Sequence, residues 1–307
     1  MTSTSTTSTG VTGTPAESTV TKNTVAKNTV PKSMRATNTR TKRTDMKRAR
    51  WKSILLPVAF ATAVLALWYV TSAFLLSPSK RFILPMPHEI LVVAFLDPSN
   101  LSDLLRQLGT TAVVAMTGLA IAAVIGITTA ILMSQAKWVE TTLYPYAVAL
   151  QSVPILALVP LIAFALGYGF GSRILVVILI SLFPIVTNTL FGLHSANAQM
   201  KDLFRLKRAS RWTILWRLQF PAALPALFTG LRISAGMAVV GAIVADFFFR
   251  QGNSGIGLAI DTYRNRLDGE MLYGAILLAS FFGLAVFWLF GVLSRLVVGT
   301  WYQPETR

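Results

Sequence analysis

Residues Ile54–Leu76 read ILLPVAFATAVLALWYVTSAFLL and contain no charged side chain. At 1.5 Å per residue, a helix of this length spans roughly 34 Å, enough to cross a hydrocarbon core of about 30 Å. More than 50 residues precede the stretch, and the apolar region of a signal peptide would be shorter. The stretch therefore predicts a transmembrane helix rather than a signal peptide.

Further apolar stretches follow along the chain. They run near Leu108–Met133, Thr142–Leu166, Ile174–Leu193, Ala222–Phe249 and Leu272–Val298. Gly and Pro recur inside them, which membrane bundles tolerate because neighbouring helices satisfy the freed backbone groups and small residues allow close packing. We expect an all-α membrane protein of about six transmembrane helices.

The composition supports a membrane protein and argues against several kinds of site. Hydrophobic residues make up 53% of the chain and charged residues 13%, against about 25% charged in soluble domains, and the mean hydropathy is +0.59. Cysteine is absent, which excludes disulfides, thiolate metal sites and cysteine nucleophiles. The two histidines, His88 and His194, lie far apart in sequence. We therefore expect no catalytic residue, no metal site and no bound cofactor.

The formal charge of +16 invites a comparison with nucleic-acid-binding proteins. Much of the excess lies in residues 1–52, and a second basic cluster lies between Lys201 and Arg217. Both adjoin apolar spans, where basic residues usually set membrane orientation. Because no aromatic side chain lies among the charges of residues 1–50, we do not expect nucleic acid as a partner.

Residues 1–50 are rich in Thr, Ser, Lys and Asn. Such a segment cannot bury enough apolar surface to offset the entropy of ordering, so we predict a disordered basic tail. A transit peptide is the alternative, but a clear amphipathic Arg-rich helix is lacking. We expect a tail over 1–50, a membrane domain over 51–302 and a short C-terminal tail over 303–307.

The distribution of Lys and Arg predicts the orientation. With the N-terminus inside, the inside segments hold 20 of these residues and the outside loops 7, Arg173 being counted as an outside loop residue. The positive-inside rule then places both termini in the cytoplasm. The N-terminal tail contributes most of this margin.

The longest inside loop covers residues 194–220. Its apolar side chains recur at helical spacing in two groups, one around Leu203 and one around Ile214. We predict two short amphipathic helices, with Pro221 and Pro225 fixing the start of the next span. Two interpretations remain open: a helix pair lying on anionic lipid, or a docking surface for a cytoplasmic partner.

Residues 202–221 resemble the EAA loop of bacterial ABC-importer permeases, in which Glu-Ala-Ala-x3-Gly-Ala precedes an apolar stretch and Leu-Pro. Asp202 takes the place of the Glu, Arg208-Ala209 that of Gly-Ala, and Phe220-Pro221 that of Leu-Pro. Arg208 replaces a glycine that normally allows a tight bend between the two short helices. The resemblance implies a coupling-helix loop on the cytoplasmic side.

Other blocks extend the resemblance over most of residues 54–302, toward the nitrate, sulfonate and taurine permease group. These blocks are Gln151-Ser-Val-Pro-Ile-Leu-Ala-Leu-Val-Pro-Leu161 with Gly167-Tyr-Gly169, Phe183-Pro-Ile-Val-Thr-Asn-Thr189, Asp246, and Gly252-Asn-Ser-Gly-Ile-Gly-Leu258, which resembles an external loop. The group also contains permeases for pyrimidine vitamin precursors and riboflavin. The resemblance implies a multi-pass permease of the bacterial plasma (inner) membrane that imports a small molecule of one of these types.

The resemblance also implies partners. The sequence contains no Gly-x4-Gly-Lys-Ser/Thr phosphate cradle, so a separate cytoplasmic ATP-binding subunit, acting as a dimer, would use the ATP. A second permease copy in a homodimer, or a paralogue, would complete the pathway within the membrane lipid, and an external substrate-binding protein would deliver the substrate. The residues implied to dock the ATPase are Asp202, Leu203, Phe204, Arg208, Ala209, Ser210, Trp212 and Leu215.

Polar residues within the spans are candidates for the pathway, because ionisable groups there are costly. The candidates are Gln151, Thr187, Asn188, Arg232 and Asp246. Each also has a structural interpretation: helix-to-helix hydrogen bonds for the three neutral residues, snorkelling or carbonyl contacts for Arg232, and a gate or packing hydrogen bond for Asp246. Arg232 and Asp246 lie about 21 Å apart along one helix, so they cannot pair directly.

A different transporter class would also suit the helix count. A secondary transporter usually has more spans or an inverted repeat, and no such repeat is detectable in this sequence. It would also need buried carboxylates for its coupling ions, which the first four spans lack. The importer permease is therefore the favoured interpretation, and a secondary transporter or another polytopic membrane protein is the alternative.

Overall fold

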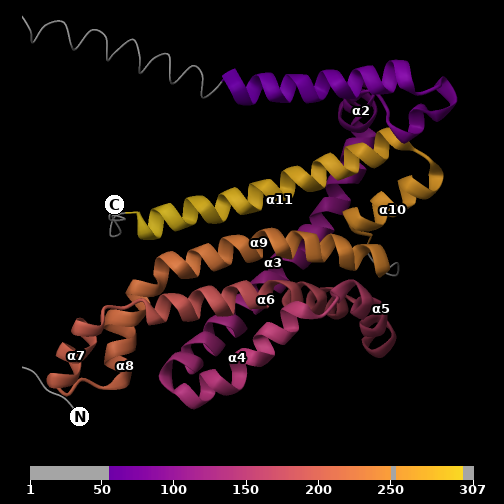
Figure 1. Cartoon of the computed structure of the whole chain (residues 1–307). Coiled ribbons are helices and arrows are strands. Elements are labelled where there is room, and N and C mark those ends of the chain that lie inside the picture. Colours follow the sequence, from indigo (N-terminus) through magenta and orange to yellow (C-terminus); the bar gives the residue numbers. More distant parts are fainter. Residues whose placement is uncertain (1–54, 250–253, 300–307) are drawn as a thin grey trace, which may run out of the picture. The chain divides into compact units, whose positions relative to one another are not determined.

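The computed structural model describes residues 55–249 and 254–299, which form helices joined by short loops, with no strand among them (Figure 1). The predicted tails over 1–50 and 303–307 lie outside the described residues. A first helix covers Leu55–Leu75 and ends in a π-helical segment, η2 (Thr71–Leu75). The later helices are η3 (Pro78–Ile83), α2 (Pro87–Ile90), η4 (Leu91–Leu96), α3 (Pro98–Gln135), α4 (Lys137–Ser152), α5 (Ile155–Leu166), α6 (Phe170–His194), α7 (Ala198–Leu206), α8 (Arg211–Ile214), η5 (Leu215–Gln219), α9 (Phe220–Phe248), α10 (Ile256–Arg266) and α11 (Gly269–Val298).

The chain divides into two compact units after Ala63. The described part of the first unit, residues 55–63, is helical and exposed. The second unit, Val64–Arg307, contains all the later helices. Every site discussed below lies within the second unit.

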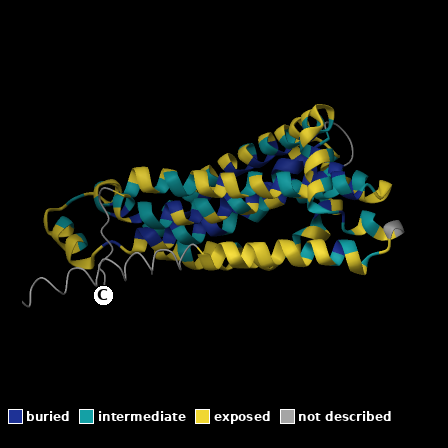
Figure 2. Cartoon of the chain, turned by 90° about the horizontal axis from the view of Figure 1, so that it is seen from above, coloured by how far each residue is buried: buried dark blue, intermediate teal, exposed yellow. Residues whose placement is uncertain are grey.

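Three long helices, α3, α6 and α9, form the centre of the second unit, and α6 packs along both of the others. Buried residues gather along these central helices (Figure 2). One core cluster joins them to α11 through small and branched apolar side chains: Val114, Ala115, Leu119, Ala122, Val177, Ile185, Ala235, Ala238, Val239, Ala242 and Val286. Van der Waals packing of these side chains holds the helices together, since lipid chains are as apolar as the core.

Glycines at two crossings allow the central helices to approach closely. A Cβ added at Gly118 of α3 would lie 2.6 Å from the Cβ of Val177, and one added at Gly230 of α9 would lie 2.8 Å from that of Asn188. Both separations are shorter than normal contact distances, so a larger residue would push α6 away. The close packing that small residues predicted is confirmed at these positions.

Five helices are long and apolar enough to cross a membrane, or up to six if the bent pair α4–α5 counts as one span. The five are Leu55–Leu75, Pro98–Gln135, Phe170–His194, Arg211–Phe248 and Gly269–Val298. Many large apolar side chains on their outer faces are exposed, as expected where lipid rather than water surrounds the protein. The all-α fold with about six spans is confirmed.

The predicted third span, Thr142–Leu166, is not one continuous helix. The helices α4 and α5 meet at a break with a bend of 97°. At the break Val153 is extended, with φ −72° and ψ 129°, because the following Pro154 disfavours the α conformation of its predecessor. Pro154 also lacks the N–H that would continue the helix. The predicted stretch is therefore helical but bent at Pro154.

Two helical segments went unpredicted. Residues Pro87–Leu96 form a short apolar helix between the first two spans, combining α2 and η4. The helix α10 begins at Ile256, inside the block predicted as a loop, and Gly252 and Asn253 of that block lie outside the described residues. At the end of α10, Leu267 adopts a left-handed conformation with φ 58°, and Asp268 then caps α11 by accepting from the Met271 amide at 3.1 Å.

Candidate functional site

The loop between α6 and α9 contains two short helices side by side (Figure 1). Asn197 caps α7 by accepting a hydrogen bond from the Gln199 amide at 2.8 Å. Ser210 caps α8 by accepting from the Thr213 amide at 3.2 Å. These polar caps satisfy amides that would otherwise lack partners at the helix starts. Short helices in this loop were predicted from the spacing of its apolar residues.

The bend between α7 and α8 lies at Arg208, which has φ 54° and is therefore left-handed. This conformation costs a residue with a Cβ roughly 1–2 kcal/mol, and glycine avoids the cost. The family pattern has a glycine at this position, and the backbone is left-handed although the residue is arginine. The α7–α8 bend is therefore strained.

The second short helix is not a separate element, contrary to the prediction. The helices α8, η5 and α9 run on without a break as one helix from Arg211 to Phe248. Pro221 follows the π-helical segment η5 and Pro225 lies inside α9, so both prolines fall within the continuous helix. The prolines therefore do not separate the loop from the span, and the loop is attached directly to α9.

Most residues predicted to dock a partner are accessible. Leu203 and Trp212 are exposed, as is Leu206, which is 82% exposed. Asp202, Arg208 and Ser210 are also exposed, while Phe204 and Ala209 are half-buried.

Leu215 was also predicted to dock the partner, and its burial corrects that prediction. It has no exposed surface and packs in a core cluster with Met133 and Leu193. A side chain buried in this way belongs to the interior of the chain, because a docking partner could not contact it. The helical spacing placed Leu215 in an apolar group but did not show which side of the helix faces the bundle.

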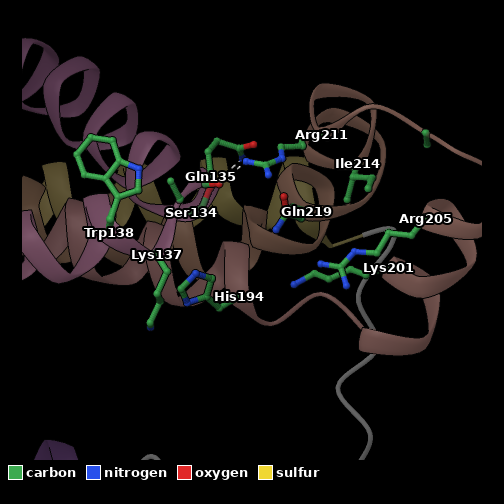
Figure 3. A pocket seen from close by; sticks show the side chains of 12 residues that line it. Ser134, Gln135, Lys137, Trp138, His194, Lys201, Arg205, Arg211, Ile214 and Gln219 are labelled. Atoms are coloured by element: carbon green, nitrogen blue, oxygen red, sulfur yellow. Dashed lines mark hydrogen bonds between the residues drawn. The ribbon is translucent and has the colours of Figure 1, made fainter.

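A cavity of about 890 Å³ lies beside this loop. Its wall combines the α3–α4 junction with α7, α8 and the end of α6 (Figure 3). The lining residues are Ser134, Gln135, Ala136, Lys137, Trp138, His194, Lys201, Arg205, Ala209, Arg211, Ile214 and Gln219. Among the described residues, the lining holds four Lys and Arg residues and no carboxylate. We call it the basic pocket.

At the opposite end of α9, Asp246 is fully buried, with 0% exposure. Its carboxylate accepts a hydrogen bond from the Thr111 hydroxyl at 2.5 Å and pairs with an Arg173 guanidinium nitrogen at 3.1 Å. Arg173 also donates to the Phe249 carbonyl at 2.8 Å, and the Thr111 hydroxyl accepts from the Ile256 amide at 2.8 Å. This Asp246 cluster connects α3, α6, α9 and the start of α10.

Glycines make room for the buried carboxylate. A Cβ added at Gly255 would collide with the carboxylate of Asp246. One added at Gly257 would lie 2.8 Å from the Asp246 Cβ and would also collide with the Ile243 carbonyl. The Gly-x-Gly pattern before α10 therefore allows the backbone to cover Asp246 closely.

The position of Arg173 also differs from the predicted one. The orientation count placed it in an outside loop, but it lies in the first turn of α6 and is only 4% exposed. It compensates the charge of Asp246, because an unpaired charge is costly in a low-dielectric interior. Sequence reasoning missed the pair because 73 residues separate its members.

Arg232 lies midway along α9 and does not meet Asp246, as predicted. Its guanidinium carbon stands 4.0 Å from the centre of the Phe287 ring on α11, and the group also lies against Gly291. Stacking of a cation on an aromatic face is favourable and more so away from water. Arg232 therefore helps attach α11 to α9.

The three neutral pathway candidates, Gln151, Thr187 and Asn188, form no hydrogen bonds with one another in the described structure. Thr187 donates to the Phe183 carbonyl at 3.0 Å and Asn188 to the Pro184 carbonyl at 2.8 Å, both within α6. These bonds differ from the helix-to-helix bonds expected of them. Gln151 is exposed at the end of α4, next to the break. Among residues 55–249 and 254–299, no group of three or more His, Cys, Asp or Glu could hold a metal ion.

Comparison with known proteins identifies the family. Residues 122–299 match the model of the binding-protein-dependent transport system inner membrane component family. The formylaminopyrimidine transport permease of Halalkalibacterium halodurans is 33% identical over 231 residues, covering 75% of this chain and 90% of that protein. The nitrate import permease of Synechocystis is 32% identical over 182 residues, covering 59% and 65% of the two chains.

A more distant relative and a solved structure agree with these matches. The putative aliphatic sulfonates transport permease of Bacillus subtilis is 28% identical, over 76% of this chain and 81% of that protein. The inward-facing MetNI methionine ABC transporter contains a chain of similar fold, with a TM-score of 0.56, 16% identity, and coverage of 63% of this chain and 95% of that chain. The protein is a member of the binding-protein-dependent transport system inner membrane component family, which comprises ABC-importer permeases of the inner membrane.

Proposed function

We propose that this permease couples substrate passage to a separate ATP-binding subunit through the α7–α8 loop. The observation that carries the proposal is the exposed apolar surface of that loop, formed by Leu203, Leu206 and Trp212. Leu203 and Leu206 lie on α7, outside the helices that could span a membrane, where water rather than lipid would meet them unless another protein covers them. In this arrangement the loop is cytoplasmic.

The continuity of α8 with α9 supports coupling. Movement of a docked partner would reach α9 directly, because no loop separates the two helices. The far end of α9 is held to α3 and α6 by the Asp246 cluster. Nucleotide-driven closure of the ATPase would therefore bias the bundle between two arrangements.

The assembly that suits this proposal contains two permease copies, an ATPase dimer and an external substrate-binding protein. The substrate is a small polar molecule of the kind named for the relatives: a formylaminopyrimidine, riboflavin, nitrate or a sulfonate. ATP would be used by the partner, and this chain would bind no cofactor of its own. Gln151, Thr187, Asn188, Arg232 and Asp246 remain candidates for lining or gating the pathway.

The docking role is tested by Leu203→Asp in the full-length protein. We expect loss of ATPase subunit in co-purification and at least a tenfold fall in uptake, because a charge replaces exposed apolar contact. Leu267→Asp is the matched control, since it changes an exposed leucine on a different loop. Normal assembly and coupling in Leu203→Asp would refute docking at this loop, and uptake that persists with every partner ATPase inactivated would refute the importer.

A further inference from the structure

The basic pocket is distinct from the surface proposed to dock the ATPase. Lys201 and Arg205, one turn apart on α7, reach into the pocket toward His194 (Figure 3). The exposed apolar residues Leu203, Leu206 and Trp212 are not part of its lining. The loop thus has two surfaces of different chemistry, and the docking proposal accounts for only one of them.

The cations of the pocket are weakly compensated by the described part of the chain. The Lys201 ammonium group has no ionic or hydrogen-bonding partner there, and Arg205 meets Asp202 at 3.4 Å in an exposed pair. Exposed pairs of this kind contribute little, about 0–1 kcal/mol. Arg211 donates to the Gln135 carbonyl at 3.4 Å, across the pocket wall. Within residues 55–249 and 254–299, none of these three cations has a buried carboxylate partner.

On the other side of the pocket, Glu140 lies 3.3 Å from Lys137 and 3.9 Å from His194. It therefore offsets Lys137 but does not contact the three cations of the loop. The α4 helix begins at Lys137 without a side-chain cap, which adds partial positive charge to this wall. The side chains of Lys201, Arg205 and Arg211 carry the argument, and the helix start only reinforces it.

Trp138 indicates where the pocket lies relative to the membrane surface. It lines the pocket and is 73% exposed. Tryptophan side chains are enriched at the level of the lipid headgroups, with the ring between apolar and polar surroundings. A basic pocket at that level meets the phosphates of anionic lipid, to which each nearby Lys or Arg contributes about 1 kcal/mol of attraction.

We propose that the basic pocket binds a phosphate group through Lys201, Arg205 and Arg211, and that an anionic phospholipid headgroup is its main source. The two interpretations of the loop that the sequence left open then both hold, on different faces: one face meets lipid and the other meets the ATPase. A bound headgroup would hold α7 and α8 against the α3–α4 junction. The proposal goes beyond the coupling function and does not depend on it.

The test is binding to the purified full-length protein in neutral detergent at low salt. Short-chain phosphatidylglycerol is titrated in, and binding is followed by thermophoresis. We expect saturable binding that falls about 30-fold in Lys201→Gln/Arg205→Gln, since each lost cation weakens it about fivefold. The control Lys207→Gln/Arg217→Gln removes the same charge from exposed loop positions outside the pocket and should change affinity less than threefold.

Two further arms separate the sources of phosphate. Failure of inorganic phosphate to compete, at matched ionic strength, would support a lipid headgroup; displacement of the lipid by phosphate would support the shared chemistry with a soluble ion as occupant. Absence of saturable binding, or an equal loss in the pocket and control variants, would overturn the proposal. Lys201→Gln alone, expected to weaken binding about fivefold, serves if the double variant is poorly folded.

Discussion

The two ends of α9 hold their charges in opposite ways. At the α7–α8 end the cations are accessible and paired weakly or not at all by the described residues. At the other end, Asp246 and Arg173 are buried, pair with each other and form hydrogen bonds with neighbouring groups. Exposed charges exchange partners at little cost, whereas buried pairs are expensive to separate. The comparison indicates one end suited to external contacts and one end suited to fixing the helices.

Breaking the Asp246 cluster should have the largest effect. In Arg173→Met, Asp246 would lose its buried partner, and we expect a loss of about 3–5 kcal/mol in the free energy of unfolding. The measurement is chemical unfolding of the purified protein in detergent micelles. The double variant Arg173→Met/Asp246→Leu should recover most of the loss, because no unpaired charge remains. A double variant no more stable than Arg173→Met would contradict the assignment of the cost to an unpaired charge.

One residue at the α7–α8 end of the long helix, Leu215, is buried. Leu215→Ala should cost about 2–5 kcal/mol, as for other fully buried leucines. Leu206→Ala, at an exposed position on the same loop, should change stability by less than about 0.5 kcal/mol. Thermal unfolding of the two variants, side by side, distinguishes an interior residue from a surface one. Equal costs would mean that Leu206 is covered within this chain.

The close packing of the Gly255 backbone against Asp246 can be tested by adding one methyl group at this glycine. Gly255→Ala should cost about 1–3 kcal/mol, because its Cβ would meet the carboxylate. Gly236→Ala is the control, since nothing lies within 4 Å of a Cβ there. In Gly236→Ala we expect unchanged or slightly higher stability, as alanine favours helix. Similar melting temperatures for both variants would show that the cover over Asp246 is loose.

The smallest expected effect lies at the strained bend. Arg208→Gly should stabilise the loop by about 1 kcal/mol, since glycine takes the left-handed conformation without the steric cost. Hydrogen exchange of the amides around α7 and α8 would report this gain as slower exchange. Faster exchange would mean that contacts of the Arg208 side chain outweigh the strain.

The sequence was sufficient for the features that depend on local pattern. Apolar length predicted the spans, and helical spacing predicted short helices in the loop. The sequence did not predict the left-handed conformation of Arg208, which has φ 54°, because a side chain normally disfavours it. The signal for the break after α4 was present, since Pro154 restricts the residue before it, but the sequence analysis treated prolines within the spans as tolerated in a membrane bundle.

Features that depend on distant contacts could not be predicted. Arg173 and Asp246 each look like residues near the end of a span, and only the packing of α6 against α9 brings them together. The burial of Leu215 depends on the rotation of α8 and η5 relative to the bundle. The basic pocket combines residues of the α3–α4 junction with residues of the 194–220 loop more than 50 positions later, and only the packing of the helices brings them together.

The unbroken connection from α8 into α9 has a mechanical consequence. At 1.5 Å per residue, the 29 residues of α9 extend for about 44 Å. With one end held as a pivot by the Asp246 cluster, each degree of tilt displaces the other end by roughly 0.8 Å over that length. A rotation of α9 by only a few degrees about the Asp246 end would therefore displace the α7–α8 loop by a few ångströms.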